Sequence, residues 1–216
     1  MPQLFPRYTN TLAPAAIVAA VVALGAAAWG MHAIIWSPYA TEVGMPVAQV
    51  VPFSHQHHVA GLGIDCRYCH TGVETSAFAG LPATETCMTC HSQVWHDAPM
   101  LAPVRASWMT GQPLHWNRVH NLPDYVYFDH SIHVRKGVAC VSCHGRVDRM
   151  PLMSKEQTLY MRWCLDCHQA PEKRLRPASE VFAMKDYPAD PQKGAALAQA
   201  AGIEKTHLQD CSVCHR

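Results

Sequence analysis

Cys66-Arg67-Tyr68-Cys69-His70 is the stretch on which this chain is built, because its pattern, Cys-x-x-Cys-His, returns four more times. The other four copies begin at Cys87, Cys140, Cys164 and Cys211. We call each of the five copies of this Cys-x-x-Cys-His motif a phrase. All ten cysteines of the 216-residue chain lie in these phrases, and each phrase ends on a histidine. The cysteines are therefore committed to one repeated local chemistry, and none remains for a separate disulfide framework.

The spacing within the phrase is that of a c-type haem attachment site. Two thiols separated by two residues reach the two vinyl groups of one porphyrin, and the next imidazole falls under the iron. Zinc sites also use Cys-x-x-Cys pairs, but they need two pairs for four ligands and no histidine after each. The sequence predicts five covalently bound haem c groups, attached through Cys66, Cys69, Cys87, Cys90, Cys140, Cys143, Cys164, Cys167, Cys211 and Cys214, with iron ligands His70, His91, His144, His168 and His215.

An uncharged apolar stretch, residues 12–36, precedes the phrases. As a helix it would be roughly 37 Å long, enough to cross a hydrocarbon core of about 30 Å. A cleavable secretory signal is the alternative, because Ala26-Ala27-Ala28 resembles a cleavage site, but the apolar region of a signal is only about 7 to 15 residues long. We expect a retained single-pass anchor in the inner membrane, with residues 1–11 as a cytoplasmic tail and the haem domain in the periplasm.

The sequence after the apolar stretch predicts a mainly α-helical domain with much irregular structure and no sizeable sheet. Asp190-Pro191 predicts a helix N-cap and first residue, and Gly202 the end of that helix. Ser154-Lys155-Glu156-Gln157 has the capping-box pattern and predicts a helix running on to Trp163. The net charge of +1 and the absence of a basic run argue against nucleic acid as a partner.

A second repeat precedes two of the phrases. Phe53-Ser54-His55-Gln56-His57-His58 and Phe128-Asp129-His130-Ser131-Ile132-His133 share the pattern Phe-x-His-x-x-His, and each is followed by two haem phrases. Two histidines three residues apart point in slightly different directions, so each pair can serve two irons. We expect a duplicated dihaem module, with a connector at 37–52, module one with its linker at 53–127, module two at 128–168, and a C-terminal segment with the fifth haem at 169–216.

The repeated pattern resembles the class III multihaem cytochromes, the cytochrome c3 and c7 group. In that family the first histidine of the pattern ligates the next haem and the second ligates another haem. The resemblance implies that His55 pairs with His70 and His130 with His144. It also implies that His58 and His133 reach the second haem of each module, at His91 and His168.

A longer resemblance rests on Trp116-Asn117-Arg118-Val119-His120-Asn121-Leu122-Pro123-Asp124-Tyr125-Val126-Tyr127-Phe128 and on Trp163-Cys164-Leu165-Asp166-Cys167-His168. These stretches, the single anchor and the C-terminal fifth haem resemble the pentahaem, membrane-anchored subunit of alternative complex III. That resemblance implies a respiratory or photosynthetic complex that oxidises quinol. It also implies iron–sulfur, multi-span quinol-binding and monohaem cytochrome c partners, beside membrane lipid.

The repeated pattern supplies distal ligands for four irons and leaves the distal ligand of the fifth iron open. We choose His120, with Met161 and Met153 as rivals whose sulfur would raise the potential of that haem. These candidates suffice to close every iron, so the sequence predicts an electron-transfer subunit with no catalytic residue of its own. A free-standing, membrane-anchored quinol dehydrogenase feeding a periplasmic reductase is the alternative, although the first site of such proteins continues Cys-His-x-Met and here His70 is followed by Thr71-Gly72.

Overall fold

The computed structural model describes residues 4–188 and 190–215. Residues 1–3 of the expected cytoplasmic tail, and residues 189 and 216 of the expected C-terminal segment, lie outside the described residues. The chain forms two compact units, one up to Val43 and the other from Gly44 onward.

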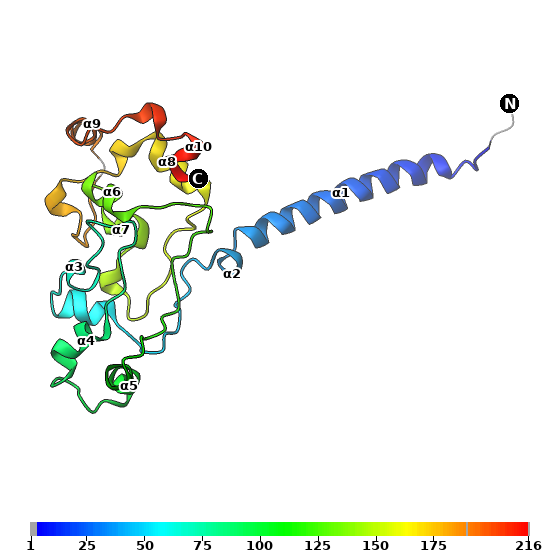
Figure 1. Cartoon of the computed structure of the whole chain (residues 1–216). Helices are drawn as coiled ribbons and strands as arrows, with labels where there is room; N and C mark the ends of the chain where they lie inside the picture. Colours follow the sequence, from blue (N-terminus) through cyan, green and yellow to red (C-terminus); the bar gives the residue numbers. More distant parts are fainter. Residues whose placement is uncertain (1–3, 189, 216) are drawn as a thin grey trace. The chain divides into compact units, whose positions relative to one another are not determined.

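The first unit contains α1 (Thr9–Ile35), one uninterrupted helix of 27 residues, and the short α2 (Pro38–Thr41) (Figure 1). Helix α1 begins three residues before the predicted stretch, where the Thr9 hydroxyl donates to the Pro6 carbonyl oxygen at 2.5 Å. No described residue of α1 is buried. Its length and composition suffice to cross a membrane, and a signal sequence near an N-terminus has the same properties.

The second unit is built from short helices joined by irregular segments. Within residues 44–188 and 190–215 the structure has no β-strand, only isolated bridges between Pro46 and Ser154 and between Val138 and Leu175. This confirms the expected mainly helical fold. The α-helices are α3 (Cys66–Cys69), α4 (Thr84–His91), α5 (Ala102–Thr110), α6 (His130–Arg135), α7 (Cys140–His144), α8 (Met161–Gln169), α9 (Pro191–Ala200) and α10 (Cys211–Cys214). A π-helix, η1 (Gln56–Gly61), and the 3-10 turns η2 (Pro99–Leu101), η3 (Val147–Arg149), η4 (Pro171–Lys173), η5 (Ala178–Glu180) and η6 (Lys205–His207) complete the described elements.

Side-chain caps fix where three of these helices begin, and at α3 the Asp65 carboxylate accepts from the N–H of Arg67. The Asp190 carboxylate accepts from the backbone N–H groups of Gln192 and Lys193, so α9 starts at Pro191 as predicted. Asp129 caps α6 in the same way, through Ser131 and Ile132. The predicted capping box at residues 154–157 is wrong. Ser154 lies in the bridge with Pro46, and the following helix begins only at Met161.

Few apolar side chains form a core. Among the described residues only nine are buried, and a cluster of Val51, Leu101 and Val104 packs against Met88 and Trp116. Many large apolar side chains stay exposed in the second unit, among them Trp95, Trp108 and Met109. A domain of this size normally buries about two thirds of the surface of its unfolded chain. Side-chain packing alone therefore does not account for this fold.

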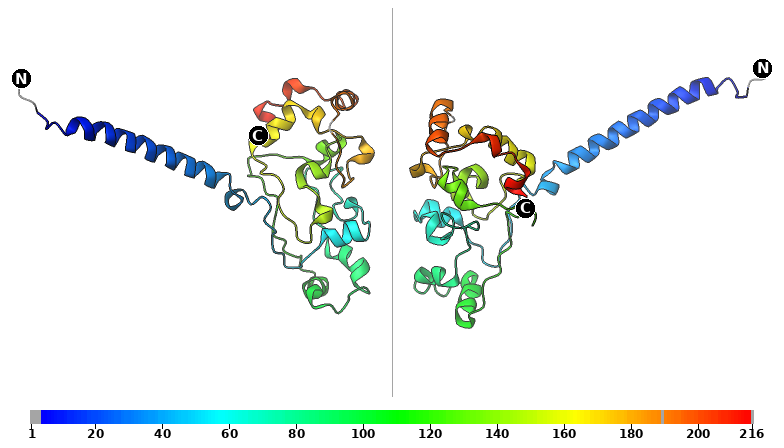
Figure 2. Two further views of the ribbon diagram at one scale, coloured as in Figure 1. Left: turned by 180° about the vertical axis from the view of Figure 1, so that it is seen from behind. Right: turned by 45° about the horizontal axis from the view of Figure 1, so that its top comes forward.

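The helices that carry the phrases follow one another along the second unit (Figure 2). Helices α3 and α4 lie toward one end, together with α5. Helices α8, α9 and α10 lie toward the other end, and α6 and α7 lie between the two groups in each view.

Replacing Gly194 by Ala should strongly destabilise the C-terminal segment. Helix α9 packs on η4, and a Cβ at Gly194 would overlap the carbonyl oxygen of Glu172, which is backbone and cannot turn away. We expect a loss of about 3 kcal/mol, the upper end of the usual range for overpacking. Thermal unfolding followed by circular dichroism measures it, with the exposed Ala196→Ser on the same helix as the control. An unchanged midpoint in Gly194→Ala would contradict the packing.

Candidate functional site

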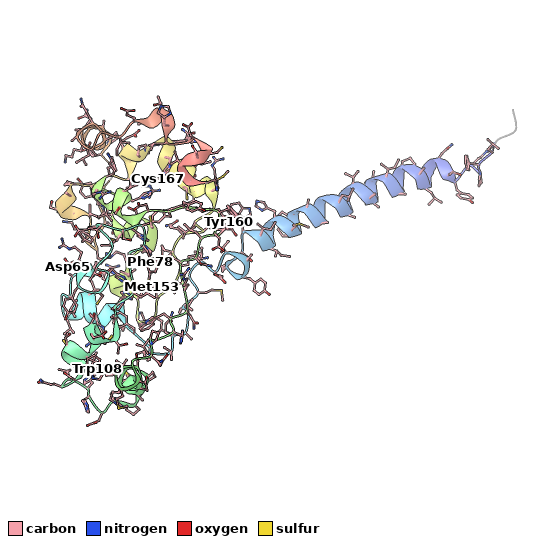
Figure 3. All side chains as sticks on the ribbon, in the orientation of Figure 1. Asp65, Phe78, Trp108, Met153, Tyr160 and Cys167 are labelled. Atoms are coloured by element: carbon pink, nitrogen blue, oxygen red, sulfur yellow. The ribbon has the colours of Figure 1, made fainter. Side chains whose placement is uncertain are left out.

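Every Cys-x-x-Cys-His phrase lies on a helix. Helices α4, α7 and α8 each include a whole phrase, whereas α3 and α10 end on the second cysteine and the histidine follows. Positions three residues apart share a helical face, so the two thiols of a phrase point to the same side. All ten cysteines are unpaired, and Figure 3 labels one of them, Cys167 on α8. The local fold thus presents five adjacent thiol pairs, each with an imidazole beside it.

Four of the five phrase histidines have their Nδ1 atom held by a backbone carbonyl. A carbonyl oxygen only accepts a hydrogen bond, so Nδ1 must carry the ring proton and the lone pair is left on Nε2. This is the tautomer that binds a metal through Nε2. The bonds run from His70 to Gly80 (2.7 Å), from His91 to Val94 (3.0 Å), from His168 to Leu208 (2.7 Å) and from His215 to Tyr125 (3.1 Å).

Three histidines of the two Phe-x-His-x-x-His patterns are oriented by the same kind of bond. The Nδ1 atom of His58 donates to the Ser54 carbonyl at 2.8 Å, and that of His133 donates to Asp129 at 2.7 Å. His130 donates to the carbonyl of Ala77, 53 residues away, at 2.8 Å. These three Nε2 atoms are likewise free to bind a metal.

The structure brings four of these histidines opposite four phrase histidines. Two imidazoles bound on opposite sides of one metal, through nitrogens about 2.0 Å from it, have ring centroids about 6.3 Å apart. The rings can rotate about the metal–nitrogen axis, so the angle between their planes is free. The observed centroid distances are 6.5 Å for His55–His70, 6.2 Å for His58–His91, 6.3 Å for His130–His144 and 6.2 Å for His133–His168. The residues present therefore fit a haem iron between the members of each pair.

The two Phe-x-His-x-x-His patterns have the same ring geometry. Phe53 stacks on His58 at 4.4 Å and meets the edge of His55 at 4.9 Å. Phe128 stacks on His133 at 4.5 Å and meets the edge of His130 at 4.8 Å. One phenyl ring in each pattern thus separates two imidazoles that face different phrase histidines. The backbones differ, because His58 lies on the π-helix η1 and His133 on the regular helix α6.

Burial keeps several of these imidazoles neutral. Desolvation, followed by the proximity of His70 and His58, lowers the pKa of His55 to about 4. Desolvation also lowers the pKa of His144 to about 3 and moves the pKa of His133 downward. Only a neutral imidazole binds a metal, so this burial favours the form that a haem iron needs.

The phrases of the first three sites are neighbours in space. The Tyr68 hydroxyl and the Thr89 hydroxyl are 2.8 Å apart, which joins the first phrase to the second. The Cys66 thiol of the first phrase lies next to the Cys140 thiol of the third, and His70 lies near His144. The N–H of Ser131, beside His130, also donates to the Ser76 carbonyl at 3.2 Å.

The remaining phrases continue this series. A cavity of about 240 Å³ is lined by Cys143 of the third phrase and Cys167 of the fourth. Cys164 of the fourth phrase lies near Cys214 of the fifth, and His168 bonds to Leu208 just before the fifth phrase. The five sites therefore follow one another in the order of their histidines 91, 70, 144, 168 and 215.

The three candidates for the distal ligand of the fifth iron differ in their position and in their burial. The ring of His120 lies 4.3 Å from that of His144, with the planes at 71°, whereas the ring beside His215 is that of Tyr125 at 5.7 Å. Met161 is 64% exposed on α8, and Met153 is partly buried in the segment before it (Figure 3). The ligand of the fifth iron stays a prediction. The contact of His120 with His144 has no counterpart in the sequence pattern that could have revealed it.

Comparison with known proteins agrees with this geometry. Residues 126–216 match the family model described as cytochrome c7 and related cytochrome c. This part of the chain is c7-like. The matched part contains α6, α7, α8 and α10, hence three of the five phrases.

One curated relative extends the comparison. The chain is 37% identical over 102 residues to the menaquinone reductase, multiheme cytochrome c subunit, of Nitratidesulfovibrio vulgaris (strain Hildenborough). The match covers 47% of this chain and 48% of that protein, so the chain spans about half the length of the relative. The similarity links a c7-like multihaem cytochrome to a subunit of a quinone-linked enzyme.

Proposed function

We propose that this chain is a multihaem electron-transfer subunit of a membrane quinone-linked oxidoreductase and carries five covalent haem c groups. The observation that supports this most is the set of four histidine pairs with ring centroids 6.2–6.5 Å apart. When bound, haem supplies one-electron redox chemistry, and the protein sets position and potential.

Each residue type has a distinct task in this proposal. The ten cysteines fix the porphyrins by thioether bonds, and the five phrase histidines bind the irons from one side. His55, His58, His130 and His133 close four of the opposite sides, held by backbone carbonyls or by burial. Closed coordination at these four irons leaves no position for a substrate there, so we propose a carrier rather than a catalyst. The matching geometry of Phe53 and Phe128 supports the duplicated dihaem module.

The order of the sites defines the path along the chain. The sites at His91 and His215 lie at its ends, and the site at His144 lies in the middle. The order of the sites in space differs from their order in the sequence, because the second phrase lies at the end of the series and the first phrase lies between it and the third. In this proposal the junction of the two modules is where Cys66 lies next to Cys140.

An intact-mass measurement tests the haem count. Denatured protein purified from the native membrane should carry five haem increments on the polypeptide, because each phrase supplies both thiols. The same mass determines whether residues 1–36 are present, as a retained anchor requires. Four or fewer increments in electron-transferring material would refute the count, and a mass starting near residue 29 would replace the anchor by a signal.

The alternative complex III assignment is the finer form of the proposal. It places the haem domain in the periplasm, with iron–sulfur, multi-span quinol-binding and monohaem cytochrome c subunits as partners. The curated relative favours a second form, because its name assigns it to a menaquinone reductase. The same series of sites would then carry electrons toward the quinone. Purifying the native complex and comparing quinol oxidation with menaquinone reduction separates the two.

A free-standing quinol dehydrogenase makes a different demand on this chain. It requires a quinone pocket formed with α1, the one helix in the described part of the chain that is long enough to span. The purified chain, free of other subunits, would then oxidise a quinol. Activity that appears only together with multi-span partners supports the subunit proposal instead.

A further inference from the structure

His144 differs from the other four phrase histidines in the partner of its Nδ1 atom. In the other four this atom donates to a backbone carbonyl at 2.7–3.1 Å. In His144 the same atom is buried and has no hydrogen-bond partner within the described part of the chain. Outer partners of a metal-bound histidine fix its tautomer and raise its basicity, so a bound His144 needs one.

The ring of His120 lies against the ring of His144. Its centroid is 4.3 Å from that of His144, and the planes meet edge to face at 71°. The Nε2 atom of His120 is itself buried and without a hydrogen-bond partner. Two buried, unpaired ring nitrogens on touching rings complement each other, since a neutral imidazole carries one donor and one acceptor. A buried polar atom without a partner destabilises the fold, which favours a bond between the two nitrogens.

We propose that His120 is a positioning residue for the middle site: its Nε2 accepts the Nδ1–H of His144 and so orients the ligand of that iron. The inference rests on the proposed function only in that His144 binds a haem. An imidazole nitrogen is a stronger acceptor than an amide carbonyl, so His144 becomes the most basic of the phrase histidines. A more basic axial ligand stabilises the ferric state, and the middle haem should have a lowered potential as a result.

The test compares His120→Leu with His120→Gln in the assembled, haem-loaded protein. Leucine removes the acceptor, and the glutamine side-chain oxygen restores one. We expect His120→Leu to raise the equilibrium constant for reduction of one haem about tenfold. For one electron this is a rise of about 59 mV in its reduction potential. All five haems should remain attached and low-spin, and His120→Gln should return most of the shift. The exposed His115→Leu is the matched control and should move none.

The shifted haem must be the middle one. His130 lies opposite His144, so His130→Ala changes the spectrum of that site and identifies its redox transition. A shift in any other transition, or no shift at all, would overturn the inference. So would a high-spin, carbon monoxide-binding haem in His120→Leu, because His120 would then be an axial ligand, as the sequence suggested. Missing haem increments would instead refute the proposed function.

Discussion

His130→Ala is expected to convert one of the five haems to a high-spin form that binds carbon monoxide. The ring of His130 faces that of His144 at 6.3 Å and 9°, and alanine has no atom that can reach an iron at that distance. His130→Ala leaves the ligands of the other four irons unchanged. Absorption and electron paramagnetic resonance spectra should therefore show one altered haem and four unaltered ones.

Two variants make this result specific. His55→Ala should open the equivalent site of the first module, because His55 faces His70 at 6.5 Å and 5°. His96→Ala is the control, since this ring pairs with Asp97 at the surface. Five low-spin haems in His130→Ala would contradict both the pairing and the assignment of the duplicated pattern.

Replacing Cys140 and Cys143 by Ala together should stop electron transfer from one end of the chain to the other. The site at His144 lies between the sites at His70 and His168, so its removal breaks the series in the middle. Intact mass should show four haems. Electron transfer by the assembled complex should fall to the level of haem-free protein, while the remaining sites stay low-spin.

Ser142→Ala changes the same phrase without touching a thiol or the histidine, and it should leave transfer intact. Transfer that continues at a substantial rate in the double cysteine variant would contradict the linear order. The site at His144 would then lie on a side branch, and the contact of Cys66 with Cys140 would have no role in the path.

The sequence predicted the parts of this structure that depend on neighbouring residues. The phrase spacing placed both thiols and a histidine on one turn, and Asp190 with Pro191 fixed the start of α9. The histidine pairings came from a resemblance, and the structure brings the rings together at distances that suit them. Physical reasoning on spacing alone would have left all four pairings open.

What the sequence could not give depends on contacts between distant segments. Ser154 has an ideal local cap pattern, yet pairing with Pro46 holds the segment extended. His130 is oriented by Ala77, and His120 contacts His144, through separations that no short pattern records. The order of the sites also arises this way, because Tyr68 and Cys66 bring phrases together that lie 21 and 74 residues apart along the chain.

The small apolar core has a consequence for how this protein is made. With nine buried apolar side chains in the described residues, the polypeptide alone has little to drive its collapse. Ten free thiols, two of them next to each other, would also oxidise to disulfides if the chain compacted first in an oxidising compartment. If the chain carries the proposed haems, attachment would come before folding: an open, reduced chain offers its thiols, and each attached porphyrin supplies the apolar surface on which the next segment packs.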